Sequence, residues 1–166
     1  MKIFLIGMPG SGKTSLGKNL ADSLKFSFID LDEVIEKNQQ LTIPRIFKLH
    51  GEDYFRNTES KILNKKGLAE DNFVMATGGG TPCFFENMSF MNELGMTIYL
   101  KISKKELTLR LGKNDSTRPM LQGEGVLYDK VSELLHTRCR YYEKADVICE
   151  SDALTLKDLK TALGQK

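Results

Sequence analysis

The sequence lacks the features that mark several large classes of protein. Its three cysteines, Cys83, Cys139 and Cys149, form no CxxC pair and no even framework, which argues against a zinc site or a disulfide scaffold and favours the reducing cytoplasm. No apolar run reaches the length of a membrane span, and the one at the N-terminus is too short for a signal peptide. Lysine and arginine outnumber aspartate and glutamate by only 24 to 22. These absences predict a cytoplasmic protein that binds neither nucleic acid nor membrane.

Arginine is scarce compared with lysine. Six of the 24 basic residues are arginines: Arg45, Arg56, Arg110, Arg118, Arg138 and Arg140. Because lysine supplies most of the positive charge, each arginine raises the question of which planar anion it binds. The 166 residues fit one domain with one sizeable core and contain no internal repeat. We therefore expect a single domain at 1–166, a monomer, and small-molecule partners.

Strand and helix patterns alternate along the chain. Short apolar runs predict strands at Lys2–Ile6, Phe26–Asp30, Phe73–Ala76, Met96–Lys101 and Asp146–Glu150. Longer periodic segments predict helices at Gly12–Leu24, Asp32–Lys37, Ile43–His50, Asp53–Leu68, Glu86–Leu94, Lys104–Leu111, Val126–Lys144 and Leu156–Leu163. Ser103 with Glu106, and Thr155 with Asp158, have the spacing of N-terminal helix caps. The alternation predicts an α/β fold built on a parallel sheet.

A phosphate-binding motif lies between the first predicted strand and the first predicted helix. Residues 7–14, GMPGSGKT, fit the pattern G-x-x-x-x-G-K-[ST]. Its glycines let backbone N–H groups turn toward phosphates, while Lys13 reaches the outer phosphates and the Thr14 hydroxyl binds Mg²⁺. A chance match arises in roughly one in a few hundred chains of this length, and the flanking elements make it rarer. The predicted nucleotide contacts are Gly10, Ser11, Gly12, Lys13, Thr14 and Ser15.

Two carboxylates follow the second predicted strand. The third strand runs into glycines and lacks the carboxylate that usually helps to hold Mg²⁺. Asp30 ends the second strand and Asp32 lies two residues on, at the edge where ligands bind in open parallel sheets. One could order the water shell of the metal while the other faces an acceptor hydroxyl. The alternative is that this acidic run only caps a helix.

Two further features have both a structural and a functional interpretation. Arg56, with Glu59 three residues on, could form an ordinary ion pair on a helix or could bind an anionic substrate. The run Gly78-Gly79-Gly80 could be a flexible turn. At the carboxyl end of a strand, however, glycines allow backbone N–H groups to approach a substrate closely.

The segment 112–125 interrupts the helical pattern. It is dominated by Gly, Asn, Asp, Ser, Thr and Pro, and its one arginine, Arg118, precedes Pro119. A loop of this length in a compact domain is more often functional than decorative. We expect a lid that closes over ATP and brings in Arg118, because closure keeps water from the transferred phosphate.

Taken together, these motifs resemble the shikimate kinase family along nearly the whole chain. The matching segments are GMPGSGKT with Leu16-Gly17, FIDLD with Ile35-Glu36, Ile46-Phe47, Gly51-Glu52, Phe55-Arg56 with Glu59, TGGG, Arg118-Pro119-Met120-Leu121, and Arg138 ahead of Tyr142-Glu143-Lys144-Ala145-Asp146. The P-loop alone is shared by a vast class, whereas the other segments in this order are specific. The resemblance implies a three-layer α/β/α P-loop NTPase fold with five parallel strands and a substrate-binding helical region at about 31–61. It also implies transfer of the γ-phosphate of ATP to the 3-hydroxyl of shikimate.

The resemblance further implies a role for each matching residue. Asp32 would hold and polarise the acceptor hydroxyl, and Asp30 would order the waters around Mg²⁺. Lys13 and Arg118 would act on the transferring phosphate. The substrate contacts would be Asp32, Phe47, Phe55, Arg56, Gly78, Gly79, Gly80 and Arg138, with the two arginines on the carboxylate. The adenine contacts would be Arg110, Ser151, Asp152 and Ala153.

One segment departs from the family pattern, and other functions stay open. Thr81-Pro82-Cys83-Phe84 stands where small aliphatic residues are expected after the three glycines. Arg140 lies close to Arg138, but the Arg-x-x-x-Tyr-Glu spacing selects Arg138 as the substrate contact. The alternatives are a kinase for another small metabolite, such as gluconate, and a non-catalytic ATP-binding regulator. A GTP-binding switch protein is disfavoured because neither Asn-Lys-x-Asp nor Asp-x-x-Gly occurs.

Overall fold

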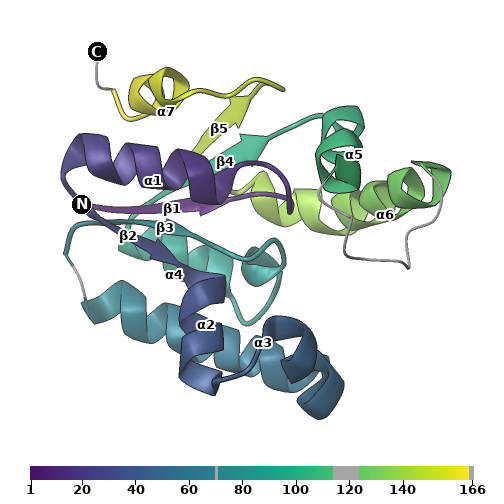
Figure 1. Cartoon of the computed structure of the whole chain (residues 1–166). Helices are drawn as coiled ribbons and strands as arrows, with labels where there is room; N and C mark the ends of the chain where they lie inside the picture. Colours follow the sequence, from purple (N-terminus) through teal and green to yellow (C-terminus); the bar gives the residue numbers. More distant parts are fainter. Residues whose placement is uncertain (70, 114–123, 165–166) are drawn as a thin grey trace.

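The computed structural model describes residues 1–69, 71–113 and 124–164 (Figure 1). The strands are β1 (Lys2–Ile6), β2 (Ser27–Asp30), β3 (Phe73–Ala76), β4 (Met96–Lys101) and β5 (Val147–Glu150). The α-helices are α1 (Lys13–Leu24), α2 (Leu31–Gln39), α3 (Ile43–Ala69), α4 (Asn87–Leu94), α5 (Lys104–Lys113), α6 (Glu124–Tyr142) and α7 (Leu156–Ala162). A short 3₁₀ helix, η1, spans Thr81–Cys83.

The strands form one parallel sheet of five in the order β2-β3-β1-β4-β5. The first strand of the chain, β1, therefore lies in the centre, where Leu5 is in register with Ala76 on β3 and Ile98 on β4. Because all the strands run the same way, their carboxyl ends meet at one edge. The P-loop, Asp30 and the glycines after β3 follow three adjacent strands, and the sheet thus brings them together.

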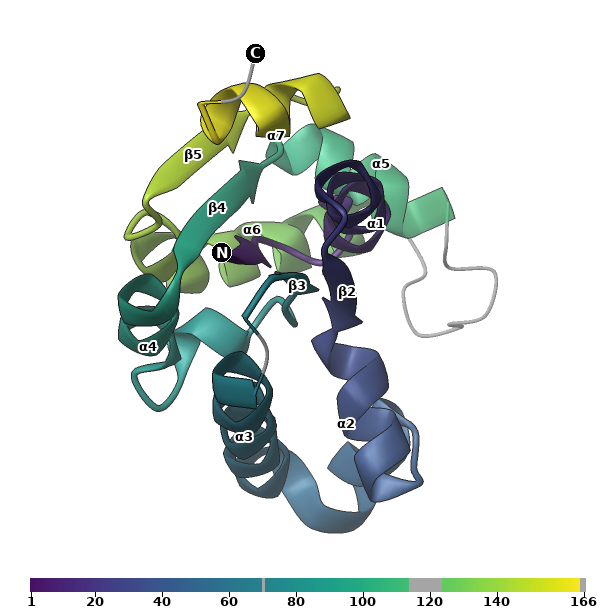
Figure 2. The ribbon, with the colours of Figure 1, turned by 90° about the vertical axis from the view of Figure 1, so that its left-hand side faces the viewer.

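Helices cover both faces of the sheet, as Figures 1 and 2 show. Alternate residues of β1 point to opposite sides. Ile3 and Leu5 pack with residues of α1 and α7, whereas Phe4 and Ile6 pack with residues of α3, α4 and α6. Each of these buried side chains contributes about 1.5–3 kcal/mol of hydrophobic free energy. The observed architecture is the three-layer α/β/α fold that was expected.

A helical lobe extends from one end of the sheet. In Figure 2, α2 and α3 lie side by side below β2. α3 bends at Gly51, which has a φ of 79° and a ψ of 176°. Glycine adopts this conformation, whereas residues with a side chain rarely do. The bend separates the two helices that the sequence predicted at 43–50 and 53–68. The lobe places the amino-terminal end of α2 and the middle of α3 beside the carboxyl edge of the sheet.

The ends of the elements differ slightly from the prediction. β2 begins after Phe26, because the Phe26 N–H bonds to the Ala21 carbonyl at the end of α1. β5 begins after Asp146, whose carboxylate accepts from the N–H and the hydroxyl of Thr97 instead. The predicted caps are confirmed, since Ser103 Oγ accepts from the Glu106 N–H and Thr155 forms a capping box. The helix η1 was not predicted.

Most of the predicted lid lies outside the described residues. Of the segment 112–125, residues 112 and 113 end α5 and residues 124 and 125 begin α6. Arg118 falls in the undescribed stretch 114–123. Within the described ranges, no helix combines the length and apolar character needed to cross a membrane.

Candidate active site

The P-loop links β1 to α1, and its shape depends on glycine. Gly10 has a φ of 81°, and Gly12, the N-cap of α1, has a φ of 95°. Residues with a side chain rarely adopt such values. A Cβ on Gly7 would lie 2.9 Å from the Leu100 carbonyl oxygen on β4. The loop therefore sets backbone N–H groups at the N-terminus of α1, where the helix dipole favours an anion.

Lys13, the first residue of α1, is buried within this loop. Its Nζ donates to the carbonyl oxygens of Gly7 at 2.9 Å and Met8 at 2.8 Å. Burial lowers the pKa of Lys13 from 10.5 to about 8, against the attraction of Asp32 and Asp30. A cation in this position acts strongly on a phosphate because little water screens it.

Thr14 and Asp30 connect the P-loop to β2. Thr14 Oγ1 donates to Asp30 Oδ2 at 2.8 Å. Asp30 Oδ1 accepts from the N–H groups of Asp32 at 3.1 Å and Glu33 at 3.4 Å, and so caps α2. Asp30 is thus both a helix cap and a partner of the P-loop hydroxyl. Hydroxyl and carboxylate oxygens are the hard donors that Mg²⁺ takes, so these residues fit that ion.

Asp32 lies in the first turn of α2 and faces the glycines after β3. A Cβ on Gly78 would lie 3.0 Å from Asp32 Oδ1. Burial raises the pKa of Asp32 from 3.8 to about 6, and repulsion from Asp30 and Glu59 adds to the shift. A carboxylate with this pKa is suited to accept a proton near neutral pH.

A single cavity connects these groups. It has a volume of about 580 Å³ and is lined by Pro9, Gly10, Gly12, Lys13, Thr14, Ser15, Asp30, Asp32, Thr77, Gly79, Arg110 and Lys113. Lys13, Asp32 and Gly79 face this space from α1, from α2 and from the loop after β3. A phosphate chain on the P-loop and an acceptor beside Asp32 would share it.

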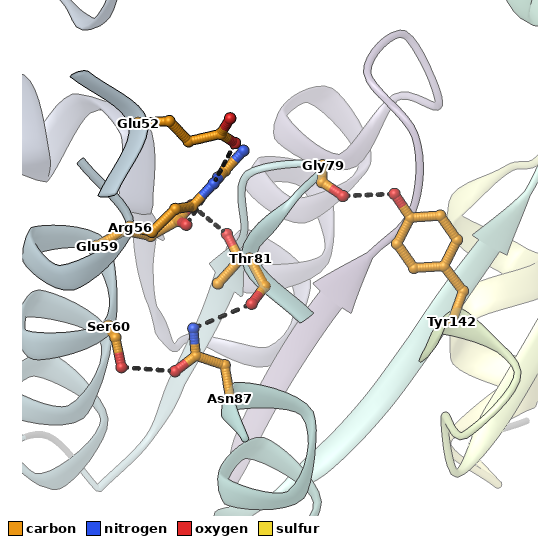
Figure 3. A network of polar contacts seen from close by, with 8 residues as sticks. All are labelled: Glu52, Arg56, Glu59, Ser60, Gly79, Thr81, Asn87 and Tyr142. Carbon is orange, nitrogen blue, oxygen red and sulfur yellow. Dashed lines mark hydrogen bonds and ion pairs between the residues drawn. The ribbon is translucent and has the colours of Figure 1, made fainter. Parts of the chain in front are cut away.

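Arg56 lies on α3, only 8% exposed, and two glutamates hold it (Figure 3). Its Nε donates to Glu52 Oε1 at 3.2 Å and its Nη1 to Glu59 Oε2 at 2.9 Å. The side chain of Glu59 is fully buried. Arg56 and Glu59 thus form the ion pair that their spacing suggested, in the interior and not on a solvated face. In the described part of the chain Arg56 Nη2 makes no hydrogen bond, which leaves donors for an anion.

The predicted aromatic wall lies beside Arg56. The rings of Phe47 and Phe55 are 4.6 Å apart between centroids. Arg56 Cζ lies 5.0 Å from the Phe55 centroid and 6.0 Å from that of Phe47. The apolar rings and the guanidinium together form a surface suited to a ring compound that carries an anionic group.

Two of the glycines after β3 lie against arginines. A Cβ on Gly79 would lie 2.6 Å from Pro9 Cδ and 3.2 Å from Arg138 Nη1. A Cβ on Gly80 would lie 2.6 Å from Arg56 Nη2. The two guanidinium groups, from α3 and α6, therefore lie against adjacent glycines, next to the P-loop.

Arg138 and Arg140 lie differently. Arg138 is partly buried against Gly79. Arg140 is exposed, and its Nη2 donates to the Tyr141 hydroxyl at 3.2 Å. The structure thus brings Arg138 to the site and leaves Arg140 on the surface.

Of the predicted adenine contacts, Arg110 lines this cavity, whereas Ser151 and Asp152 line a separate pocket of about 380 Å³. Arg110 on α5 donates to the Asp152 carbonyl oxygen at 2.5 Å and to that of Gly10 at 3.4 Å. The Asp152 carboxylate accepts from the N–H and the hydroxyl of Ser103. These bonds tie the loop after β5 to α5 and to the P-loop. In the same loop, Ser151 Oγ accepts from the Ala153 N–H.

Sequence reasoning missed a set of residues behind the glycines (Figure 3). Thr81 donates to Glu59 and Asn87 donates to the Thr81 carbonyl oxygen, while Tyr142 donates to the Gly79 carbonyl oxygen. Tyr142 belonged to a recognised motif, but no role was predicted for it. Asn87 gave no signal, because its bonds to Thr81 and Ser60 form only when α4, η1 and α3 pack together.

Comparison with known proteins identifies the family. The model of the shikimate kinase family matches residues 9–163. The chain belongs to the shikimate kinase family. It is 42% identical to a shikimate kinase of Clostridium botulinum over 152 residues, which cover 90% of this chain and 88% of that protein.

Solved shikimate kinases have the same fold. The crystal structure from Bacteroides thetaiotaomicron superposes with a TM-score of 0.92 at 37% identity and covers 99% of this chain and 98% of that one. A shikimate kinase from Acinetobacter baumannii, in complex with shikimate, gives 0.85 at 35% identity, covering 98% of this chain and 89% of that one. Shikimate kinases are ATP-dependent phosphotransferases, so the gluconate and regulator alternatives are not favoured.

Proposed function

We propose that this shikimate kinase transfers the γ-phosphate of ATP to the 3-hydroxyl of shikimate. The observation that carries the proposal is the shared cavity, which is lined by the buried Lys13, by Asp32 and by Gly79. The P-loop supplies phosphate contacts, and a carboxylate with a raised pKa lines the same cavity.

Asp32 positions the acceptor. Its carboxylate accepts a hydrogen bond from the hydroxyl and orients the oxygen toward the phosphate. It takes the proton as the new bond to phosphorus forms and the bond from the γ-phosphorus to the departing ADP breaks. The pKa of about 6 keeps it ionised at neutral pH while leaving it basic enough to accept a proton. The raised pKa is therefore consistent with the proposed role.

Two arginines hold the acceptor by its carboxylate. Arg56 and Arg138 lie against Gly80 and Gly79, so a carboxylate in front of these glycines meets both guanidinium groups and nearby backbone N–H groups. Phe47 and Phe55 provide the apolar wall for the ring. A substrate fixed at this end has its hydroxyls oriented relative to Asp32.

The remaining groups act on the phosphates. The ammonium of Lys13 stabilises charge on the outer phosphates, and Arg118, the arginine of the predicted lid, is the second cation. Mg²⁺ would be held by the Thr14 hydroxyl and, through water, by Asp30, and when bound it supplies positive charge to the phosphates. A cytoplasmic monomer is likewise proposed, and size-exclusion chromatography with light scattering tests the monomer.

A coupled assay for ADP production tests the function. Shikimate, gluconate, nucleoside monophosphates and no acceptor are compared with ATP and Mg²⁺ present. We expect ADP production that depends on shikimate, with only background rates in the other reactions. Equal rates with and without shikimate, or a preference for another acceptor, would overturn the proposal.

A further inference from the structure

The segment that departs from the family pattern, residues 81–84, packs directly behind Arg56. Thr81 begins η1 and is fully buried, and Phe84 ends the segment as the C-cap residue of η1. Small aliphatic residues in these positions could donate no hydrogen bond and offer no aromatic face. Thr81 and Phe84 offer both, and each contacts the ion pair that contains Arg56.

We propose that Thr81 and Phe84 are positioning residues that fix the guanidinium of Arg56 for the substrate carboxylate. The inference rests on the proposed function, because it assigns Arg56 to that carboxylate. It adds two residues that do not touch the substrate. They act through the orientation of Arg56, and their effect is therefore on substrate affinity.

Thr81 donates a hydrogen bond to Glu59, the buried partner of Arg56. Glu59 has no exposed surface, so each of its carboxylate oxygens needs a partner in the protein. Oε2 accepts from Arg56 Nη1 at 2.9 Å, and Oε1 accepts from Thr81 Oγ1 at 2.6 Å (Figure 3). The hydroxyl thus fixes the plane of the carboxylate, and that plane fixes the direction in which Arg56 points.

Thr81 is itself held in place by hydrogen bonds to neighbouring elements. Its carbonyl oxygen accepts from Asn87 Nδ2 at 3.0 Å, and Asn87 Oδ1 accepts from Ser60 Oγ at 2.8 Å (Figure 3). Ser60 follows Glu59 on α3, so these bonds form a closed circuit from α3 through α4 and η1 back to α3. A closed circuit allows the Thr81 hydroxyl little freedom to move.

The ring of Phe84 stacks on the guanidinium of Arg56. The Phe84 ring centroid lies 4.5 Å from Arg56 Cζ, nearer than the rings of Phe55 and Phe47. Gly80 also lies against this guanidinium, since a Cβ there would be 2.6 Å from Nη2. Arg56 is thus confined between the glycine backbone and aromatic rings, while Nη2, which bonds to no other described residue, stays available to a carboxylate.

Backbone strain next to Phe84 supports a positioning role. Phe85 and Glu86 have φ values of 49° and 55°, in the left-handed region that residues with a side chain rarely adopt. Two such residues in succession persist where the surrounding structure determines them. Phe84 is partly buried on Arg56, whereas Phe85 is 60% exposed, so the strained turn serves to direct Phe84 inward.

The test separates positioning from general stability. Thr81→Val removes the hydroxyl at nearly constant volume, Thr81→Ser restores a hydroxyl, and Thr97→Val is the matched control. Thr97 is also fully buried and its hydroxyl contacts a carboxylate, that of Asp146, but it lies on β4 away from the cavity. Melting temperature, kcat, and KM for shikimate and for ATP are measured for all three variants.

We expect Thr81→Val to raise the KM for shikimate about tenfold, as for a lost hydrogen bond to a charged group, with kcat and the KM for ATP within about twofold of wild type. Thr81→Ser should recover most of the loss. Thr97→Val should lower the melting temperature and leave both KM values unchanged. A shikimate analogue with a neutral amide in place of the carboxylate should bind wild type and Thr81→Val equally.

A second variant keeps the proposal testable if Thr81→Val fails to fold. Phe84→Leu removes the aromatic face and should raise the KM for shikimate about threefold to fivefold, again without change in the KM for ATP. Unchanged KM for shikimate in both variants, or parallel rises in both KM values, overturns the inference. A wild-type protein that does not phosphorylate shikimate would instead refute the proposed function.

Discussion

The two sides of the cavity are built from different parts of the chain. On the nucleotide side, one continuous segment, residues 7–14, supplies the backbone, the lysine and the hydroxyl. On the acceptor side, α2, α3, the loop after β3 and α6 each supply one to three groups. The first side is held by the local geometry of glycines, whereas the second is held by contacts between elements far apart in the sequence. Mutations should therefore separate the two sides kinetically.

The largest expected effect is on the nucleotide side. Lys13→Met keeps a long side chain but removes the charge that faces the phosphates, so turnover should fall about a thousandfold. Shikimate binding, measured by isothermal titration, should stay within about threefold of wild type. Lys18→Met is the matched control, because Lys18 is an exposed lysine on the same helix and should be tolerated. If Lys13→Met weakens shikimate binding as much as ATP binding, the two sides are not separate.

Asp32 lies where the two sides meet. Asp32→Asn should reduce turnover about a hundredfold and leave ATP binding nearly intact, the usual scale for a lost positioned base. In wild type, kcat/KM should fall as the pH drops below about 6, because Asp32 becomes protonated. Glu33→Gln, at the exposed neighbouring position, is the control. Turnover at the wild-type level in Asp32→Asn would show that Asp32 has no catalytic role and only stabilises the first turn of α2.

The same substitution should stabilise the protein. A carboxyl whose pKa is higher in the folded state than its ordinary 3.8 binds its proton more tightly there, so wild-type stability falls as the pH rises from about 4 to about 6. Above about pH 6 the buried carboxyl of Asp32 is ionised, and the full free-energy cost of its burial lowers the stability of the wild type. Asp32→Asn should therefore be about 1–3 kcal/mol more stable than wild type at pH 7. Urea unfolding at pH 7 and pH 4 measures the difference, which should shrink at the lower pH. A constant difference would exclude the titration of Asp32 as its cause.

The smallest effect is expected at the adenine end. Ser103→Ala removes the hydroxyl that donates to the Asp152 carboxylate and caps α5, and the Asp152 carbonyl in turn holds Arg110. The KM for ATP should rise about threefold, since the bond is exposed and the backbone N–H remains a donor. The KM for shikimate should not change. A rise in both KM values would show that the loop after β5 also shapes the acceptor side.

The nucleotide side could be predicted from the sequence because its determinants are local. The glycines of residues 7–14, Lys13 and Thr14 form one continuous pattern, and the caps at Ser103 and Thr155 depend on residues three positions apart. Gly51 separated two predicted helices because a φ of 79° suits glycine. In each case the structure depends on a few neighbouring residues.

The acceptor side could be predicted only in part. The resemblance pointed to Arg56 and Arg138, but neither periodicity nor spacing could show that Glu59 is fully buried or that Thr81 is its second partner. That bond joins residues 22 positions apart and exists only once η1 packs on α3. The pKa of Asp32 likewise depends on burial among residues of several elements. Such properties follow from tertiary packing, which a single sequence does not reveal.

The central place of β1 in the sheet also affects synthesis of the protein. The ribosome releases β1 first, but its two neighbours begin only at Phe73 and Met96. Until β3 and β4 have been synthesised, both edges of the apolar strand β1 are unpaired. Nascent chains with an exposed apolar strand aggregate readily. The domain can therefore close only after more than half of the chain has emerged, and fragments that stop before β4 should depend on chaperones to stay in solution.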